Sequence, residues 1–265
     1  MKTILYTGAS SGLAKEVIEK IKNKYKIYLG VHTKKQLELV KDRYKNEKNI
    51  EVIKLDLLDN DDIQKIKKLD IDILISNAAI GYGGSVAEIK IEKLKEIYEV
   101  NVFKNIELIQ IVLKNMIKKG KGKIIIISSL SGLMTLKFMG PYSSSKASLI
   151  KLAQALKKEM KLINKNIKIT LIEPGMYKTG FNQIMIKDKY DCMEIDSFFK
   201  NQLEKIKKRD NIFWNLFEYK KQKTITKQIV KAIKQNDKFI YSAPKLQRIF
   251  AKIYSLLNDW LLIMT

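Results

Sequence analysis

Residues 2–14 read KTILYTGASSGLA, and this stretch decides the fold. An apolar, β-branched run of strand length leads into Gly8 and Gly12, and a helical pattern begins directly after them. Glycines at such a turn let the backbone bend tightly and approach a pyrophosphate, while the helix N-terminus supplies N–H donors. The stretch therefore predicts a phosphate-binding loop, and an ordinary strand–helix turn is the alternative.

Similar strand-length runs alternate with longer segments whose apolar residues lie three and four apart. The runs cover residues 2–7, 26–31, 50–55, 72–76, 123–128, 167–172 and 238–241. This alternation is typical of βαβ units with right-handed crossovers, which build a parallel sheet covered on both faces. We predict an α/β fold: a single Rossmann-like, doubly wound parallel sheet of about seven strands, with helices on both faces and a helical C-terminal appendage. Ligands are then expected at the carboxyl ends of the strands.

The chain has 265 residues and a formal net charge of +23, from 51 Lys and Arg against 28 Asp and Glu. Hydrophobic residues make up 46%, which excludes a disordered chain, and we expect one domain over residues 1–265. Only Arg43, Arg209 and Arg248 are arginines, the residue that nucleic-acid sites favour. We therefore interpret the charge as a solvated lysine surface and expect no nucleic-acid partner.

The chain has one cysteine, Cys192, and one histidine, His32. A lone cysteine excludes a disulfide scaffold and a cysteine-based zinc cluster, fits a reducing compartment, and leaves no metal site to expect. A lone histidine removes most histidine-dependent catalysis. The opening MKTILYTGAS is polar too soon for a signal peptide, and no uncharged apolar run is long enough to span a membrane, so we expect a cytoplasmic location.

Residues 128–146, SSLSGLMTLKFMGPYSSSK, carry the strongest chemical signal. Tyr142 and Lys146 are four residues apart and share a face if they lie on a helix. An ammonium near a phenol favours the phenolate, so we expect Lys146 to lower the pKa of Tyr142 toward what a general acid–base needs. Ser129 ends a predicted strand and can hydrogen-bond the same substrate oxygen. Chance is the alternative for a Tyr–Lys spacing in so lysine-rich a chain.

These residues make the chain resemble the short-chain dehydrogenase/reductase family, whose loop is T-G-x-x-x-G-x-G with Ala14 here at the last glycine. Leu55-Asp56-Leu57, Asn77-Ala78-Ala79 and Pro174-Gly175-Met176-Tyr177-Lys178-Thr179 are similar to further family motifs, with Ala79 replacing a glycine. The resemblance covers residues 1 to about 180 and continues loosely to about 241. It implies an NAD(P)-dependent oxidoreductase that transfers a hydride between nicotinamide and a carbonyl or alcohol group.

The resemblance also implies a role for each site residue. Tyr142 would exchange a proton with the substrate oxygen, Ser129 would position that oxygen, and Lys146 would bind the nicotinamide ribose. Asn101 would be a fourth catalytic residue, bending a helix and holding a water that links Lys146 to solvent. The implied cofactor-binding residues are Gly8, Ser10, Ser11, Gly12, Leu13, His32, Thr33, Lys34, Asp56, Leu57, Asn77, Ala78, Ala79, Tyr142, Lys146, Pro174, Gly175 and Thr179.

The segment after Val31 bears on the choice of cofactor. An acidic residue there would accept hydrogen bonds from the adenosine ribose and favour NAD, but the chain reads His32-Thr33-Lys34-Lys35. Positive charge attracts a 2′-phosphate, so we expect NADP (NADPH), with NAD less favoured. Alternatively, Lys34 and Lys35 only begin the next helix on its solvent face.

The C-terminal third predicts a substrate lid over residues 176–223 and an amphipathic helix over 244–265. The lid aromatics, together with Tyr82, Leu130 and Phe138, favour an apolar carbonyl or alcohol substrate; packing of the lid is the alternative. Residues 224–235 predict a helix capped by Thr224 or Thr226. The last helix is basic and carries Trp260, so it either packs on this subunit or a partner, or lies in a membrane interface.

Two other functions keep the same fold. One is an epimerase or dehydratase of the same family, although such relatives are usually longer. The other is a non-catalytic NADP-binding sensor, which would not need Ser129, Tyr142 and Lys146 together. The resemblance further suggests a homodimer or a homotetramer.

Overall fold

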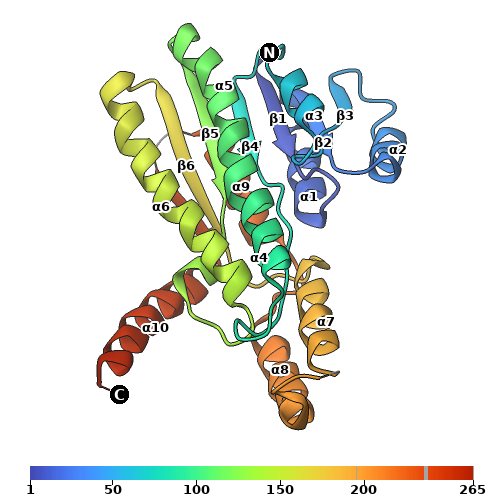
Figure 1. Ribbon diagram of the computed structural model, residues 1–265. Helices are drawn as coiled ribbons and strands as arrows, with labels where there is room; N and C mark the ends of the chain where they lie inside the picture. Colours follow the sequence, from blue (N-terminus) through green and yellow to red (C-terminus); the bar gives the residue numbers. More distant parts are fainter. Residues whose placement is uncertain (195, 236–237, 265) are drawn as a thin grey trace.

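The computed structural model describes residues 1–194, 196–235 and 238–264, with side chains described up to residue 257. One sheet of parallel strands runs in the order β3-β2-β1-β4-β5-β6-β7 (Figure 1). This order places the reversal of winding between β1 and β4, so the predicted doubly wound, Rossmann-like sheet is confirmed. The strands are β1 (Thr3–Thr7), β2 (Lys26–Val31), β3 (Ile50–Lys54), β4 (Ile73–Ser76), β5 (Gly122–Ile127), β6 (Ile167–Pro174) and β7 (Ile240–Ala243).

Two hydrophobic cores lie on the two faces of the sheet. Along β1, Ile4 and Tyr6 belong to one core and Leu5 to the other, because successive strand side chains point to opposite faces. Strands buried on both faces read as continuous apolar runs. The bounds predicted from these runs therefore differ from the observed strand bounds by at most two residues. The first core packs under α1 (Gly12–Ile21), α2 (Lys34–Arg43) and α9 (Lys223–Lys234), and the second under α3 (Asn60–Ile66), α5 (Asn105–Lys119) and α6 (Gly140–Ile163).

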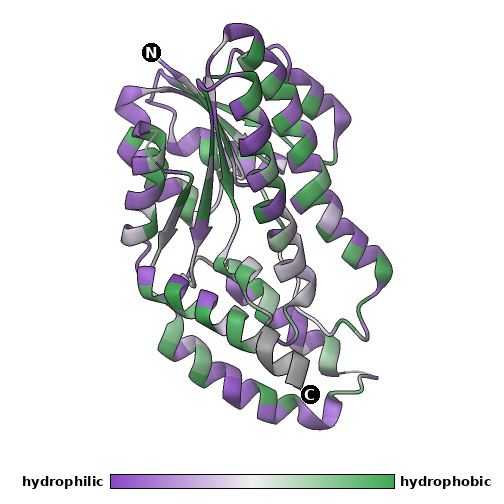
Figure 2. Ribbon diagram, turned by 90° about the vertical axis from the view of Figure 1, so that its left-hand side faces the viewer, coloured by the Kyte–Doolittle hydropathy of each residue, from purple (hydrophilic) through white to green (hydrophobic). Residues whose placement is uncertain are grey.

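Three helices extend beyond the carboxyl ends of the strands, at the lower end of the molecule in Figures 1 and 2. They are α7 (Phe181–Glu194), α8 (Leu203–Phe217) and α10 (Lys245–Met264). Helix α4 (Ile91–Tyr98) continues into α5 through a π-helical turn, Glu99–Lys104. Within the described residues, no helix combines the length and apolarity that crossing a bilayer requires.

The predicted threonine cap of α9 is wrong. The helix starts one residue earlier, after Gln222, and no side chain caps it. The Thr226 hydroxyl instead lies 2.9 Å from Glu16 Oε2 of α1 and 3.0 Å from the Gln222 carbonyl. Thr224 pairs with the Tyr177 hydroxyl at 2.6 Å. Tyr177, in the loop after β6, and Glu16 of α1 therefore bind the two hydroxyls that the spacing suggested as caps.

Candidate active site

The turn from β1 into α1 has the geometry of a phosphate-binding loop. Gly8 has a φ of +64°, and a Cβ built on it would lie 2.9 Å from the Ala78 Cα, so only glycine fits without strain. The loop is anchored where Ala9 N donates to the Gly30 carbonyl at 3.0 Å. Ser11 caps α1, its hydroxyl accepting from Ala14 N at 3.2 Å. The N–H groups of the first turn thus face the end of the sheet where a phosphate would bind.

Asn77 holds this loop to the end of β4. Its Nδ2 donates to the Thr7 and Gly8 carbonyls at 3.0 and 3.2 Å. In return, the Thr7 hydroxyl accepts from the backbone N–H groups of Asn77 and Ala78, both at 2.9 Å. The expectation that Asn77 supports the strand end agrees with this geometry. Thr7 is an equal partner that the sequence did not single out.

Ser129, Tyr142 and Lys146 meet at the end of β5. Ser129 follows the strand and starts a short 3-10 turn, while Tyr142 and Lys146 lie on the first turns of α6. The Ser129 and Tyr142 side chains share a hydrogen bond. Lys146 Nζ lies 5.6 Å from the centroid of the Tyr142 ring and donates to the Ile127 carbonyl at 3.3 Å. The strand end and the helix face thus bring the three side chains together as the spacing predicts.

Burial controls the ionisation of this cluster. The Tyr142 and Lys146 side chains are both buried. Burial raises the pKa of the Tyr142 phenol far above its ordinary value, and the hydrogen bond with Ser129 lowers it by less. Burial lowers the pKa of the Lys146 ammonium to about 8. The pKa of Tyr142 is therefore raised and not lowered as expected, because burial of the phenol is the larger cause and only the hydrogen bond with Ser129 opposes it.

Asn101 lies behind the cluster, in the π-helical turn between α4 and α5. Its Nδ2 donates to the Ile80 carbonyl at 2.9 Å and to Ser145 Oγ at 3.0 Å, and its Oδ1 accepts from Ile80 N at 2.8 Å. Ser145 in turn donates to the Tyr142 carbonyl at 2.7 Å. The helix is irregular at Asn101, as expected. The side chain connects the loop after β4 to the helix turn that carries Tyr142.

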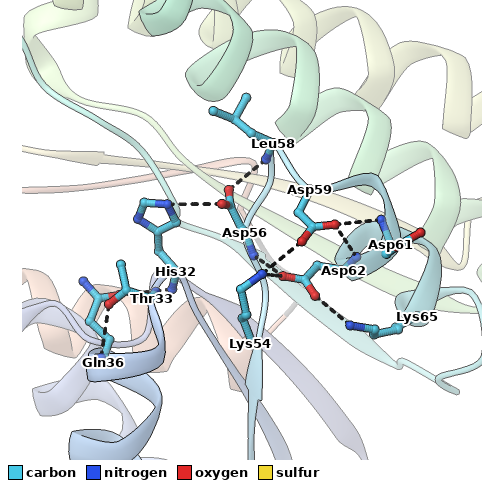
Figure 3. Close-up of polar contacts among 10 residues, drawn as sticks. All are labelled: His32, Thr33, Gln36, Lys54, Asp56, Leu58, Asp59, Asp61, Asp62 and Lys65. Atoms are coloured by element: carbon cyan, nitrogen blue, oxygen red, sulfur yellow. Dashed lines mark hydrogen bonds and ion pairs between the residues drawn. The ribbon is translucent and has the colours of Figure 1, made fainter.

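The carboxyl ends of β2 and β3 form the other end of the site (Figure 3). His32 Nε2 lies 3.3 Å from Asp56 Oδ2, and the Asp56 Oδ1 accepts from Leu58 N at 2.9 Å. Gln36 Oε1 accepts from the backbone N–H groups of His32 and Thr33 at 3.1 and 3.3 Å. Gln36 also completes a capping box with Thr33, a Thr-x-x-Gln signal that could have identified it from the sequence.

A cavity of about 1150 Å³ joins the phosphate loop, the Tyr142 cluster and the His32–Asp56 end. Gly12, Thr33, Lys34 and Asn101 do not line it. Gly12 faces the Gln222 side chain, Thr33 caps α2, and Lys34 is exposed on α2. The predicted residues that line it are Gly8, Ser10, Ser11, Leu13, His32, Asp56, Leu57, Asn77, Ala78, Ala79, Ser129, Tyr142, Lys146, Pro174, Gly175 and Thr179.

Apolar side chains of α7 and α8 line the cavity beside this cluster. The Phe181 ring of α7 lies 5.5 Å from the Tyr142 ring, and Met185 packs in the same cluster. Thr179 Oγ1 accepts from Phe181 N at 3.3 Å and fixes the start of α7. Further lining residues on this side are Leu130, Tyr177, Ile184, Trp214, Leu216 and Phe217.

Tyr82 and Phe138, which we expected beside the substrate, do not line the cavity. The Tyr82 hydroxyl contacts Cys192 Sγ, and the Phe138 ring meets the Phe199 ring edge-on. Besides Gln36, two further glutamines that the sequence did not single out line it. Gln222 Nε2 lies 3.5 Å from the Lys178 carbonyl, and Gln247 joins Met176 N to the Phe217 carbonyl. No short motif marks either residue.

The site fits a dinucleotide. Gly8 allows the tight turn packed on Ala78, and α1 directs its N-terminus into the cavity that this turn lines. Lys146 keeps ammonium donors beyond the one given to Ile127. A doubly wound parallel sheet with a nucleotide-type loop after β1, and a Ser–Tyr–Lys cluster at the end of β5 two strands along the sheet, defines a class of dinucleotide-dependent oxidoreductases.

Comparison with known proteins gives the family. The family described as short chain dehydrogenase matches residues 2–189, and the chain belongs to it. An NADPH-dependent 3-dehydrocapnine reductase of Ornithobacterium rhinotracheale is 32% identical over 192 residues, which cover 68% of this chain and 66% of the reductase, just under two thirds of its length.

Solved structures show the same fold at lower identity. A short chain dehydrogenase/reductase of Burkholderia phymatum in complex with NAD has a TM-score of 0.81 at 17% identity, covering 98% of this chain and 95% of that one. A short-chain dehydrogenase of Sphingobium yanoikuyae in complex with NADPH has a TM-score of 0.73 at 19% identity, covering 100% and 95%.

Proposed function

We propose that this protein is an NADP-preferring oxidoreductase that interconverts a carbonyl and an alcohol group on an apolar substrate. The observation that carries the proposal is the meeting of Ser129, Tyr142 and Lys146 at the end of β5, inside the cavity that begins at the phosphate loop. A binding protein would need the loop but has no use for a buried phenol and a buried ammonium on one helix face.

In the proposed mechanism each site residue has a separate role. The bound nicotinamide supplies or accepts the hydride. Tyr142 gives its phenolic proton to the substrate oxygen during reduction and takes it back during oxidation. Ser129 hydrogen-bonds the same oxygen and stabilises the charge that develops on it. Lys146 holds the ribose end of the cofactor, and the backbone around Gly8 and Ser11 holds the phosphates.

The preference for NADP rests on charge at the end of β2. No carboxylate follows Val31, His32 is exposed at the edge of the cavity, and Lys34 and Lys35 are exposed on the next turn. Asp56 lies beside His32 and offsets part of that positive charge. The NADPH dependence named for the relative from Ornithobacterium rhinotracheale supports the same preference.

The apolar substrate rests on the lid. Phe181 and Met185 pack beside Tyr142, where a carbonyl group would have to lie, and Trp214 also lines the cavity. Such a lining excludes water and binds hydrocarbon in place of hydrated groups. In this proposal residues 176–223 form the lid of a single NAD(P)-binding domain that spans residues 1–265.

A panel of ketones and aldehydes of increasing chain length, assayed with NADPH and NADH at the nicotinamide absorbance, tests the proposal. It predicts turnover that rises with apolar length and is faster with NADPH at low cofactor concentration. Turnover only with polar sugars, or cofactor binding without any turnover across the panel, would contradict it.

Self-association as a homodimer or homotetramer is part of the proposal. An apolar groove of about 1130 Å³ lies between α4 and α6, and Val86, Ile91 and Phe103 are exposed along it. A second copy would cover these side chains. Light scattering of the wild type and Phe103→Ser should give an oligomer and a smaller species, respectively; equal masses for both would contradict this interface.

A cytoplasmic location, with peripheral membrane contact through residues 244–265, is also proposed. The reduced, exposed Cys192 fits a reducing compartment. Cell fractionation should recover the protein in the cytosol and in salt-extractable association with membranes.

A further inference from the structure

One face of α10 is fixed to the body of the protein. Arg248 Nε lies 2.7 Å from the buried Glu173 carboxylate at the end of β6, and the Tyr254 hydroxyl donates to the Thr135 carbonyl at 3.0 Å. Gln247 and Ala251 are buried on the same side of the helix. These contacts set the rotation of α10 and therefore decide which side chains point outward.

The outward face is apolar and uncovered in this chain. Leu246 is 75% and Leu256 72% exposed, and Ile249, Ile253 and Leu257 are each more than half exposed. Their spacing of three and four residues puts them on one stripe of the helix. An apolar stripe of this kind on a folded protein marks an interaction surface.

Helix α8 extends this stripe into one continuous surface. The Phe217 ring at the end of α8 stacks on the Phe250 ring of α10, with centroids 6.2 Å apart and planes at 21°. Ile212 and Leu216 of α8 are also exposed. Figure 2 shows both helices at the same end of the molecule with green, hydrophobic stretches. We call this the α8–α10 surface; its members are Ile212, Leu216, Phe217, Leu246, Ile249, Phe250, Ile253, Leu256 and Leu257.

Basic side chains border the α8–α10 surface. Lys245 and Lys252 are exposed on α10, each four residues before an apolar member, Ile249 and Leu256, and so lie along its edge. Arg209 is exposed on α8, and no acidic residue occurs between 245 and 257. A second copy seated on this face would bring matching lysines together on chains that each carry +23, whereas an anionic surface would neutralise them.

The cavity opens on the same surface. Leu216, Phe217, Leu246 and Phe250 are members of the α8–α10 surface and also line the cavity that holds Tyr142. An apolar molecule could therefore pass from whatever covers this surface into the site without crossing a polar rim at these four side chains.

We propose that the α8–α10 surface docks on an anionic phospholipid bilayer and that the substrate is an amphiphilic carbonyl compound drawn from that bilayer. A stripe of Leu, Ile and Phe with lysines at its edge is the pattern of a helix lying in the lipid interface. The docking step deepens the membrane contact proposed for residues 244–265 and does not depend on the proposed reductase activity; the substrate step rests on that activity.

Sedimentation with vesicles tests the docking. The wild type should bind vesicles of phosphatidylglycerol and phosphatidylcholine, bind pure phosphatidylcholine at least about tenfold less, and lose binding as salt rises. The triple variant Ile249→Ser/Ile253→Ser/Leu257→Ser should bind the anionic vesicles at least about tenfold less than the wild type. The matched control Leu39→Ser/Leu162→Ser/Ile163→Ser removes as many exposed apolar side chains from α2 and α6 and should bind like the wild type.

Two outcomes overturn the docking. One is anionic vesicle binding that is absent in the wild type or equal in the two triple variants. The other is a change of oligomeric mass in the α10 variant with no change in vesicle binding, which would assign the face to a second copy of this chain. Neither readout depends on turnover, so a failed reductase assay leaves this result standing.

Turnover by the wild type tests the substrate step. Anionic vesicles should raise the rate for a long-chain ketone dissolved in them by at least about tenfold over the same vesicles of phosphatidylcholine, and should leave a short water-soluble ketone unaffected. An equal rate for the long-chain ketone in anionic and in phosphatidylcholine vesicles would overturn the substrate step. It would leave the proposed reductase activity intact.

Discussion

Lys146 Nζ lies 5.6 Å from the centre of the Tyr142 ring and donates its hydrogen bond to the Ile127 carbonyl, so the ammonium sits beside the phenol without pairing with its oxygen. The Phe181 ring of α7 packs against the same ring. The tyrosine is therefore desolvated from both sides. This arrangement keeps Tyr142 protonated, which is the form that a carbonyl reduction uses.

The phenol of Tyr142 should resist ionisation in the cofactor-free protein. Burial raises its pKa above the ordinary value of about 10, so titration through that value should leave it neutral. The difference in ultraviolet phenolate absorbance between the wild type and Tyr142→Phe measures this one group. A phenolate that appears in that difference below about pH 10 would contradict the burial argument.

Lys146 should make the unfolding free energy depend on pH. Its pKa of about 8 in the folded protein lies below its value of 10.5 in water, so the unfolded chain binds the extra proton between these pH values. Stability due to this group is therefore complete above about pH 10.5 and is lost as the pH falls through about 8. The loss is on the order of 3 kcal/mol.

Urea unfolding of the wild type and Lys146→Met across this range isolates the effect, because other titrating groups are common to both proteins. Relative to the variant, the wild type should gain stability as the pH rises. A difference that stays constant from about pH 7 to about pH 11 would show that the ammonium is not desolvated.

Asn101→Ala should destabilise the fold by about 3 kcal/mol, because it leaves the partly buried Ile80 N–H and carbonyl and the buried Ser145 Oγ each short of a partner. Denaturant unfolding measures the change. Asn115→Ala, which removes one exposed hydrogen bond from α5, is the matched control and should cost less than about 0.5 kcal/mol. Equal effects of the two substitutions would mean that Asn101 does not hold the loop after β4.

His32→Asp should shift the cofactor preference toward NADH. The new carboxylate would stand beside Asp56, where a 2′-phosphate is expected, and would repel it. We expect the ratio of NADPH to NADH affinity, measured by fluorescence titration, to fall by about tenfold or more. Asn23→Asp adds the same charge at the opposite end of β2 and should leave the ratio unchanged. A ratio that moves equally in both variants would place the preference elsewhere.

The sheet and the phosphate loop could be predicted because their causes are local. β5 reads as an apolar run from Ile124 to Ile127 because it is buried on both faces, and Gly8 is required by its own backbone angle. Tyr142 and Lys146 could be paired because helical spacing alone puts them on one face.

The features that could not be predicted come from contacts between distant segments. The pKa of Tyr142 follows from Phe181 and Met185, which reach it from a different helix. Gln222 and Gln247 enter the cavity from the C-terminal third, where no motif marks them. Thr226 is drawn from its expected capping role by Glu16 of α1. Each depends on tertiary packing, which overrides local preference.

Turnover by Tyr142→Phe tests the central claim most directly. The substitution keeps the ring that packs on Phe181 and removes only the hydroxyl that shares a hydrogen bond with Ser129. The proposed mechanism predicts a fall in kcat for ketone reduction of about 10²- to 10⁴-fold with unchanged NADPH affinity. Tyr44→Phe, at a buried tyrosine outside the cavity, should retain wild-type turnover. Wild-type turnover by Tyr142→Phe would contradict the assignment of Tyr142 as the proton donor.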